Sequence, residues 1–348
     1  MHGFAIQSVE PALAAKIDCL SRPDTYDRKP PNVICRETHM SWVFLAGDEV
    51  YKLKKPVRFP YLDFSTLERR EAACRAELRL NRRLAPDIYL DVVPLTARNG
   101  TIAIGGEGAP VDWLVHMKRL DERFMLDHMI GEKSLSVVHL DRLIDTLARF
   151  YHSAAPVLLP AAVHLADWRQ SLAFNRRILL DRRFGLPAGL VQRIDRAQRR
   201  FLQRRSQLIS ARLRHRRIVD GHGDLRPEHI WLDDKVRIID CLEFNARLRI
   251  VDPFDEIAFL DLECDRLGAA WAGRYIRRRM SHLLRDGPAD ELFAFYRCHR
   301  ATLRARLAIA HLLETHPRTP EKWPRLCATY LKFAELSARK LDACLRTP

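Results

Sequence analysis

The stretch VDGHGDLRPEHIWLDDKVRIID, residues 219–240, contains a polar loop followed by two short apolar strands. The turn Asp233–Asp234 separates the two strands, and Asp240 follows the second of them. Because a hairpin folds back on itself, we expect Asp224 in the loop and Asp240 at the strand end to lie near one point. Two carboxylates beside basic groups suit metal-assisted phosphoryl transfer, in which one takes or orients the hydroxyl proton and the other holds Mg²⁺.

The region before this stretch, from residue 33 to about 120, has the residue types and turns of β-strands. Trp42–Leu45 and Glu49–Lys54 are two extended runs, separated by a glycine-containing turn of hairpin length. A helix is expected from Ser65 to about Leu84, because Ser65 is a suitable N-cap with a glutamate three residues later. These patterns predict a strand-rich unit with one helix.

After Leu120 the apolar spacing changes to the period of α-helices. The helix expected over Leu135–His152 carries an apolar stripe that is typical of a core-facing helix. Two arginine-rich helices are expected within residues 166–214, broken by a Gly-Leu-Pro turn. The chain is therefore predicted to be an α+β protein of two lobes, with a small strand-rich N-lobe at 1–120 and a larger helical C-lobe at 121–348.

The polar loop resembles the aminoglycoside phosphotransferase family of the protein-kinase-like superfamily, which also includes choline kinases. The matching motifs are H-G-D-L, with Asp224 at the catalytic-base position, and Ile239-Asp240, with Asp240 at the position of the metal-binding aspartate. The run DPFDEIA, residues 252–258, resembles a D-P-x-x-D-L-A stretch of the same family. The resemblance covers roughly residues 33–310 and implies a bilobal kinase-like fold, ATP and Mg²⁺ as cofactors, and a small-molecule acceptor.

A narrower resemblance rests on ETHMSWVFL, residues 37–45, and YKLKKP, residues 51–56. Both are similar to a bacterial group of this family in which the kinase-like domain is often fused to a P-loop ATPase domain. The 348 residues contain no G-x-x-x-x-G-K-[ST] motif. We therefore expect the kinase-like cleft, and not a Walker motif, to hold any nucleotide.

The resemblance also implies a phosphate-pairing lysine on the third strand and a helix glutamate that orients it. Lys52 and Lys54 are two residues apart, so both face the same side of one strand. Either residue fits this role, and Lys54 is narrowly preferred because it follows an apolar residue; on the helix, Glu77 is preferred. Ser41, in a turn that lacks glycine, and Met117, in the segment that joins the lobes, are further expected nucleotide contacts.

His229 stands where the family has an asparagine that offers oxygen to a second Mg²⁺. Mg²⁺ prefers oxygen to imidazole nitrogen, so His229 is an unfavourable metal ligand. Three interpretations stay open: one metal suffices, or His229 orients Asp224, or the protein is catalytically poor. The predicted function is ATP-dependent phosphorylation of a hydroxyl of an unknown small molecule. The alternative is a pseudokinase-like nucleotide-binding regulatory or scaffold protein.

The composition limits the remaining classes of function. Lys and Arg total 59 against 44 Asp and Glu, and the net charge of +15 favours an anionic partner. Residues 176–217 form the densest basic stretch, and a nucleic-acid surface there is a weaker alternative, so no nucleic-acid partner is expected. Eight cysteines without zinc-like spacing, and no secretory signal or membrane span, predict a cytoplasmic protein. We expect an acidic acceptor bound by helices within 166–214 and 262–310, and the sequence does not indicate the oligomeric state.

Overall fold

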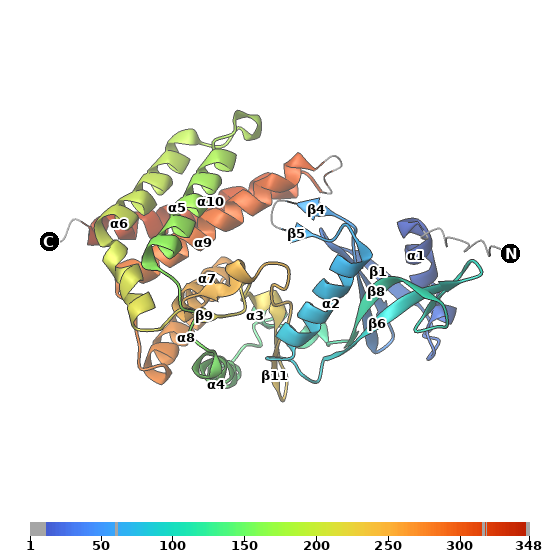
Figure 1. Ribbon diagram of the computed structural model, residues 1–348. Coiled ribbons are helices and arrows are strands. Elements are labelled where there is room, and N and C mark those ends of the chain that lie inside the picture. Colours follow the sequence, from blue (N-terminus) through green and yellow to red (C-terminus); the bar gives the residue numbers. More distant parts are fainter. Residues whose placement is uncertain (1–11, 60–61, 315–316, 318, 346–348) are drawn as a thin grey trace. The chain divides into compact units, whose positions relative to one another are not determined.

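Strands dominate the first third of the chain, and helices make up most of the rest (Figure 1). The computed structural model describes residues 12–59, 62–314, 317 and 319–345. These residues divide into two compact units. The first unit holds the described residues up to Glu122 together with Arg237–Ala246, and the second unit holds the remainder. The predicted α+β class is confirmed.

A six-stranded antiparallel sheet forms the frame of the first unit, with the strand order β1-β2-β3-β8-β6-β7. Two short strands, β4 and β5, make a separate pair. The strands are β1 Val33–Glu37, β2 Ser41–Ala46, β3 Glu49–Lys54, β4 Arg58–Phe59, β5 Leu62–Asp63, β6 Tyr89–Arg98, β7 Thr101–Ile104 and β8 Ala109–Lys118. Strand β3 is therefore an interior strand with a hydrogen-bonded neighbour on each side.

The predicted hairpin is confirmed, because β2 and β3 pair antiparallel across the turn that contains Gly47. Gly47 has a φ of +63°, a left-handed conformation that a residue with a Cβ rarely adopts. On its other side β3 pairs with β8, so Lys52 lies between Val43 and Val115 in the sheet. Since side chains alternate along a strand, Lys52 and Lys54 share one face of the sheet.

Helix α2, Leu67–Asn81, packs against strands β6 and β8 of this sheet (Figure 1). Its buried residues include Cys74, Glu77 and Asn81, which recur at helical spacing. Residues three and four apart share one face of a helix, so the buried face of α2 includes Glu77. A carboxylate on a buried helix face needs a charged or hydrogen-bonding partner.

The N-cap of helix α2 lies one residue later than the sequence predicted, and the helix ends at Asn81 and not near Leu84. Thr66 is the N-cap, and its side chain accepts the Arg69 amide at 3.3 Å. The predicted cap, Ser65, instead donates its hydroxyl and its amide to Asp63, at 2.6 and 3.1 Å. The local aspartate turn therefore competes for Ser65 and leaves the capping role to Thr66.

A buried charged group attaches helix α1, Leu13–Leu20, to the sheet. Asp112 is 1% exposed and accepts Lys16 Nζ at 2.8 Å and Arg70 Nε at 2.7 Å. Lys16 also donates to the backbone carbonyl of Val111 at 2.7 Å. Because Asp112 compensates two buried cations, its carboxylate holds α1 and α2 on the same sheet.

Residues Arg237–Ala246 belong to the first unit, although the chain on either side of them belongs to the second. Arg237 forms an ion pair with Asp87 at 2.6 Å, and the Ile238 amide donates to the Leu84 carbonyl at 3.4 Å. The sequence suggested a single boundary near residue 120, but the chain returns to the first unit at Arg237–Ala246. Asp240 therefore belongs to the first unit, which contains the six-stranded sheet.

Eight helices and several short strands make up the described part of the second unit. The two arginine-rich helices predicted within residues 166–214 are confirmed as α5 and α6. The helices are α3 Leu126–Gly131, α4 Val137–Ser153, α5 Ala161–Leu179, α6 Ala188–Arg214, α7 Pro253–Arg266, α8 Ala270–Leu283, α9 Asp290–Ala310 and α10 Lys322–Cys344. The short strands are β9 Val219–Asp220, β10 Ile230–Leu232 and β12 Ile250–Val251, and β11 Val236–Ile238 crosses into the first unit.

Helix α7 is the central helix of the second unit, because every residue from Pro253 to Cys264 is buried. It packs against α8 and α9. Asp252 caps its N-terminus by accepting the Phe254 amide at 2.9 Å, and Arg212 of α6 donates to the same carboxylate at 2.9 Å. A helix that is buried on all sides fixes the position of every segment packed on it.

None of the helices in the described ranges is long and apolar enough to cross a bilayer. All eight cysteines are free thiols, and six of them are buried. Buried free thiols behave as small apolar side chains.

We predict that Asp112→Ala lowers the free energy of unfolding by about 3–5 kcal/mol, because the change leaves two buried cations without their carboxylate. Chemical denaturation of the wild type and the variant measures this difference. Asp18→Ala, which removes an exposed carboxylate from α1, is the matched control and should have little effect. Equal losses of stability in the two variants would contradict the prediction that the buried Asp112 carboxylate contributes more to stability than the exposed Asp18 carboxylate.

Candidate active site

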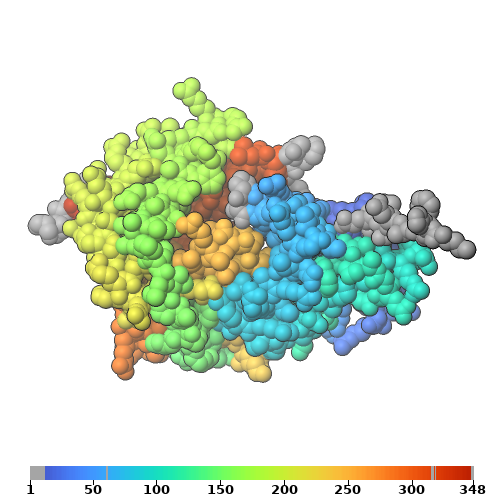
Figure 2. Space-filling model, in the orientation of Figure 1, coloured from blue at the N-terminus to red at the C-terminus, as the bar shows by residue number. Residues whose placement is uncertain are grey.

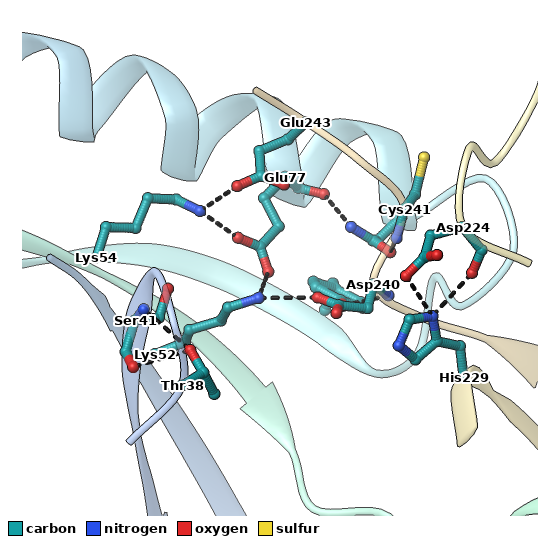
Figure 3. A network of polar contacts seen from close by, with 12 residues as sticks. Thr38, Ser41, Lys52, Lys54, Glu77, Asp224, His229, Asp240, Cys241 and Glu243 are labelled. Atoms are coloured by element: carbon teal, nitrogen blue, oxygen red, sulfur yellow. Dashed lines mark hydrogen bonds and ion pairs between the residues drawn. The ribbon is translucent and has the colours of Figure 1, made fainter. Parts of the chain in front are cut away.

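Two lysines and three carboxylates form one connected cluster in the first unit (Figure 3). Glu77 of α2 is at its centre, and its two oxygens accept Lys52 Nζ at 2.9 Å and Lys54 Nζ at 2.6 Å. Lys52 also donates to Asp240 at 2.9 Å, and Lys54 also donates to Glu243 at 2.5 Å. We call these five side chains the lysine–carboxylate cluster.

The exposure of the lysine–carboxylate cluster changes from one end to the other. The Asp240 side chain is 47% exposed and that of Lys52 is 16% exposed, whereas that of Lys54 is 1% exposed. Glu77 and Glu243 are also largely buried. The Asp240 end is therefore accessible to a ligand, and the Lys54 end is enclosed by protein.

The charges in this cluster shift the pKa values of its members. Burial lowers the pKa of Lys52, but Asp240 and Glu77 outweigh burial and hold that pKa well above its usual value. Burial raises the pKa of Glu77, but the two lysines outweigh burial and bring that pKa below its usual value. At Glu243 burial prevails, and the pKa of this carboxyl is raised in spite of Lys54. The lysines and Glu77 are therefore charged at neutral pH.

The cluster contains one more carboxylate than lysine, so it carries a net charge of −1 when all five groups are ionised. A divalent cation would compensate this excess, and Mg²⁺ takes carboxylate oxygens while it keeps several waters. Asp240 is the most exposed of the three carboxylates, and the ammonium of Lys52 lies beside it. The residues present therefore fit Mg²⁺ at Asp240 and a phosphate group next to Lys52.

The backbone at Asp240 has an unusual conformation. Its φ is +62°, a left-handed value that is uncommon for residues other than glycine. The Asp240 amide donates to the Tyr89 hydroxyl at 3.2 Å, and the next amide, of Cys241, donates to Asn81 Oδ1 at 2.9 Å. These two hydrogen bonds, from strand β6 and helix α2, hold the backbone in this conformation and thereby orient the Asp240 carboxylate.

Ser41 begins β2 and closes a tight turn with Thr38 (Figure 3). The Ser41 amide donates to Thr38 Oγ1 at 3.0 Å, and the Thr38 amide donates to the Ser41 carbonyl at 2.8 Å. The Ser41 amide is therefore already bonded within the turn, and the residue is only 2% exposed. Met117 is 9% exposed and lies in an apolar cluster with Val50 and Tyr89, so its side chain is part of the core.

In the second unit, Asp224 lies in the loop between β9 and β10. Arg226 donates to the Asp224 carboxylate at 3.0 Å and to Glu228 at 2.5 Å. His229 Nδ1 is 2.9 Å from the Asp224 carbonyl oxygen and 3.7 Å from its carboxylate (Figure 3). His229 Nε2 is 3.1 Å from the Arg226 guanidinium. Arg226 and His229 together restrict the position of Asp224.

The same neighbours keep Asp224 ionised. Burial raises the pKa of this carboxyl, but the charges of Arg226, His229 and Arg304 outweigh burial and bring the pKa below its usual value. A general base must be unprotonated at the working pH. Asp224 therefore has the protonation state that proton abstraction requires.

Glu256 of α7 holds the backbone that precedes Asp224. Its carboxylate accepts the amides of His222 at 3.0 Å and Gly223 at 2.5 Å, and also the Tyr151 hydroxyl at 2.9 Å. A Cβ at Gly221 would lie 2.6 Å from the same carboxylate, so only glycine fits there without displacing Glu256. The fully buried helix α7 thus fixes the loop through one carboxylate.

The structure joins the four residues Lys52, Lys54, Glu77 and Asp240 in one cluster, whereas Ser41 and Met117 are not members of it. Sequence reasoning missed Glu243, for which a glutamate three residues after Asp240 was the available signal. It also gave no role to Glu256, although the run DPFDEIA contains it. Both residues act through partners far away in sequence, which spacing alone does not show.

No protein-family model matches the chain. An uncharacterised protein of Mycobacterium tuberculosis and one of Mycobacterium bovis are each 32% identical to it over 311 residues, which is 86% of this chain. The chain spans about 60% of the length of these curated relatives.

Solved structures similar to this chain are small-molecule kinases. Choline kinase from Cryptosporidium parvum matches with a TM-score of 0.54 and 9% identity, covering 96% of this chain and 97% of that one. A thermostable mutant of an aminoglycoside phosphotransferase matches with a TM-score of 0.50 and 11% identity, covering 91% and 94%. The chain therefore has the bilobal protein-kinase-like fold of these proteins. The resemblance identified in the sequence is confirmed at the level of the fold.

We predict that Lys54→Met lowers the free energy of unfolding by about 3–5 kcal/mol, because it leaves Glu243 buried without a cation and Glu77 with Lys52 alone. Lys52→Met should cost clearly less, since Lys54 still compensates Glu77. Glu243→Gln is the control, because glutamine keeps an acceptor for Lys54 and removes a charge whose burial is unfavourable. Denaturation midpoints of the three variants test the ranking, and equal losses for the two lysine variants would contradict it.

Proposed function

We propose that the chain is a phosphotransferase that moves the terminal phosphoryl group of ATP to a hydroxyl of a small molecule, with Mg²⁺. The observation that carries this proposal is the row of ion pairs from Asp240 through Lys52 to Glu77. Within a kinase-like fold, a helix glutamate that holds a strand lysine beside a metal-binding aspartate is suited to binding Mg·ATP.

Lys52 is the better candidate for the phosphate-pairing lysine, although the sequence narrowly favoured Lys54. Lys52 is partly exposed and is paired with Asp240, the accessible carboxylate. Lys54 is enclosed between Glu77 and Glu243, so a phosphate could reach it only by breaking a buried ion pair. We therefore assign Lys52 to the nucleotide and Lys54 to the positioning of Glu77.

Asp224 is proposed as the general base. The acceptor hydroxyl oxygen forms a bond to the γ-phosphorus, and the bond from that phosphorus to the β–γ bridging oxygen breaks. ADP leaves with the electron pair of the broken bond, and the hydroxyl proton passes to the Asp224 carboxylate. Asp240 would hold Mg²⁺, which neutralises charge on the phosphate oxygens when it is bound.

His229 is proposed as a positioning residue for Asp224 and not as a metal ligand. Its two ring nitrogens face the Asp224 carbonyl and Arg226, at 2.9 and 3.1 Å. Both contacts lie within the loop, and imidazole nitrogen is a poor ligand for Mg²⁺. This supports the second of the three interpretations that the sequence left open.

The acceptor is proposed to be a small molecule with an anionic group. Arg304 lowers the pKa of Asp224, while the carboxylate paired with it, Glu263, is 3.8 Å away. Arg304 also donates Nε to the Tyr330 hydroxyl at 3.4 Å, so its contacts within the protein are long and its guanidinium is able to bind an anion on the acceptor. The acceptors in the names of the structural neighbours, choline and aminoglycosides, are not transferred to this chain, because a shared fold does not fix the substrate.

A pseudokinase-like nucleotide-binding protein is the second candidate. It is favoured by two observations: His229 replaces the asparagine of the family, and the Ser41 amide is already bonded within its turn. A pseudokinase would bind Mg·ATP through Lys52 and Asp240 but would not form ADP.

We predict that Asp224→Asn abolishes ADP formation and leaves ATP affinity nearly unchanged, because a base acts on the acceptor only in the transition state. Asp240→Ala should remove the Mg²⁺ dependence of ATP binding. Calorimetric ATP titrations with and without Mg²⁺, together with an ADP-release screen of small-molecule acceptors, measure both effects. Asp145→Asn, on the exposed face of α4, is the control. If both Asp224→Asn and Asp240→Ala weaken ATP binding and neither lowers ADP formation by the bound enzyme, Asp224 is not the base.

We predict that His229→Asn lowers turnover and leaves the Mg²⁺ affinity unchanged, because asparagine cannot reproduce both ring contacts in this loop. Steady-state rates and Mg²⁺ titrations of the wild type and the variant test this. Higher turnover at low Mg²⁺ in the variant would instead identify position 229 as a metal-ligand position. Mg·ATP binding without turnover in either protein would favour the pseudokinase.

A further inference from the structure

A basic hollow of about 390 Å³ lies on α6, outside the candidate active site. It is formed by side chains between residues 192 and 204 of α6 and by Arg176 of α5. Five of its eight lining residues are arginines, two are glutamines, and the last is Asp195. In Figure 2 the yellow-green spheres of this part of the chain lie on the visible surface.

The arginines of the basic hollow are only partly compensated. Asp195 pairs with Arg176 at 3.2 Å and with Arg199 at 2.8 Å, and Arg200 pairs with Asp342 at 2.9 Å. Within the part of the chain that the structure describes, Arg196 and Arg204 have no hydrogen-bond or ion-pair partner. Two guanidinium groups in the hollow are therefore available to a ligand.

The spacing of these arginines concentrates positive charge on one face of the helix. Arg196, Arg200 and Arg204 follow one another at four-residue intervals, so they lie one above the other on the same face of α6. Like charges at this spacing repel and weaken a helix. The row from Arg196 to Arg204 is about 12 Å long at 1.5 Å per residue, the length of a small ligand.

We propose that the basic hollow binds a compact polyphosphate anion, a small molecule that carries two or more phosphate groups close together. Guanidinium groups bind phosphate oxygens in a bidentate manner, and the amides of Gln192 and Gln203 add further donors. All the lining side chains are polar or charged, and none of them is aromatic or aliphatic. This lining recognises oxyanions and little else.

The limited length of the row favours a small ligand over a nucleic acid. The next residue, Arg205, is paired with Glu291 at 3.3 Å, and the exposed Gln207 that follows is uncharged. A DNA duplex presents a phosphate about every 3.4 Å along each strand, so a protein that follows it needs a longer basic track. The proposal is independent of the proposed phosphotransferase activity.

The test is a calorimetric titration of the full chain with sodium tripolyphosphate, with thermal unfolding as a second readout. Arg196→Gln/Arg204→Gln removes two arginines without leaving a carboxylate unpaired. Arg193→Gln/Arg214→Gln is the control, because it removes the same charge from the same helix outside the hollow. We expect the first pair to weaken tripolyphosphate binding at least about tenfold and the control pair by less than about twofold.

Tripolyphosphate should also raise the unfolding temperature of the wild type and of the control pair, and not that of Arg196→Gln/Arg204→Gln. Equal weakening of tripolyphosphate binding in both double variants would mean that the overall positive charge of the helix, and not the basic hollow, binds the anion. This result would overturn the proposal. Binding that neither pair weakens would place the anion elsewhere, for example at Lys52, and would also overturn it. If a 20-base-pair DNA duplex binds more tightly than tripolyphosphate, and Arg196→Gln/Arg204→Gln abolishes this binding, the ligand is a nucleic acid and the proposal of a small anion is wrong.

Discussion

The enclosed ion pairs of Lys54 with Glu77 and Glu243 are the interaction on which the candidate nucleotide site depends. Removing these groups from water is unfavourable, and the arrangement is stable only while both carboxylates face the lysine, at 2.6 and 2.5 Å. Glu77 belongs to α2, Lys54 to β3, and Glu243 to the segment Arg237–Ala246. One buried ammonium therefore joins three separate parts of the first unit and limits their relative movement.

The accessible end of the cluster follows from this constraint. With Glu77 fixed by Lys54, its second oxygen is available to hold Lys52, and Lys52 in turn faces Asp240. The excess carboxylate charge is thereby concentrated where the side chain is exposed, which is where a cation would bind. In the second unit, the backbone amides of His222 and Gly223 donate hydrogen bonds to the buried Glu256 and thereby hold the loop of Asp224. In both units a buried carboxylate orders the group that the proposed chemistry uses.

Local patterns in the sequence predicted the β2–β3 hairpin, helices α5 and α6, and the fold class, because these depend on turn chemistry and periodicity. The placement of Lys52 and Lys54 on one face also followed from strand geometry alone. The choice between them did not, since it depends on Glu243, whose approach to Lys54 spans 189 positions in the chain. The role of Glu256 was not predictable either, because its hydrogen-bond partners His222 and Gly223 are far from it in the sequence. The N-cap was misassigned because Ser65 and Thr66 are both suitable caps, and the sequence did not show that Ser65 bonds to Asp63.

The most direct test of this account is labelling with an acyl phosphate derivative of ATP, which transfers its acyl group to a lysine beside the terminal phosphate. Peptide mass spectrometry then identifies the modified lysine. The account predicts that Lys52 is labelled, that the enclosed Lys54 is not, and that excess Mg·ATP prevents the labelling of Lys52. Labelling of Lys54 instead, or labelling of Lys52 that Mg·ATP does not prevent, would contradict the assignment of the lysine–carboxylate cluster as the nucleotide site.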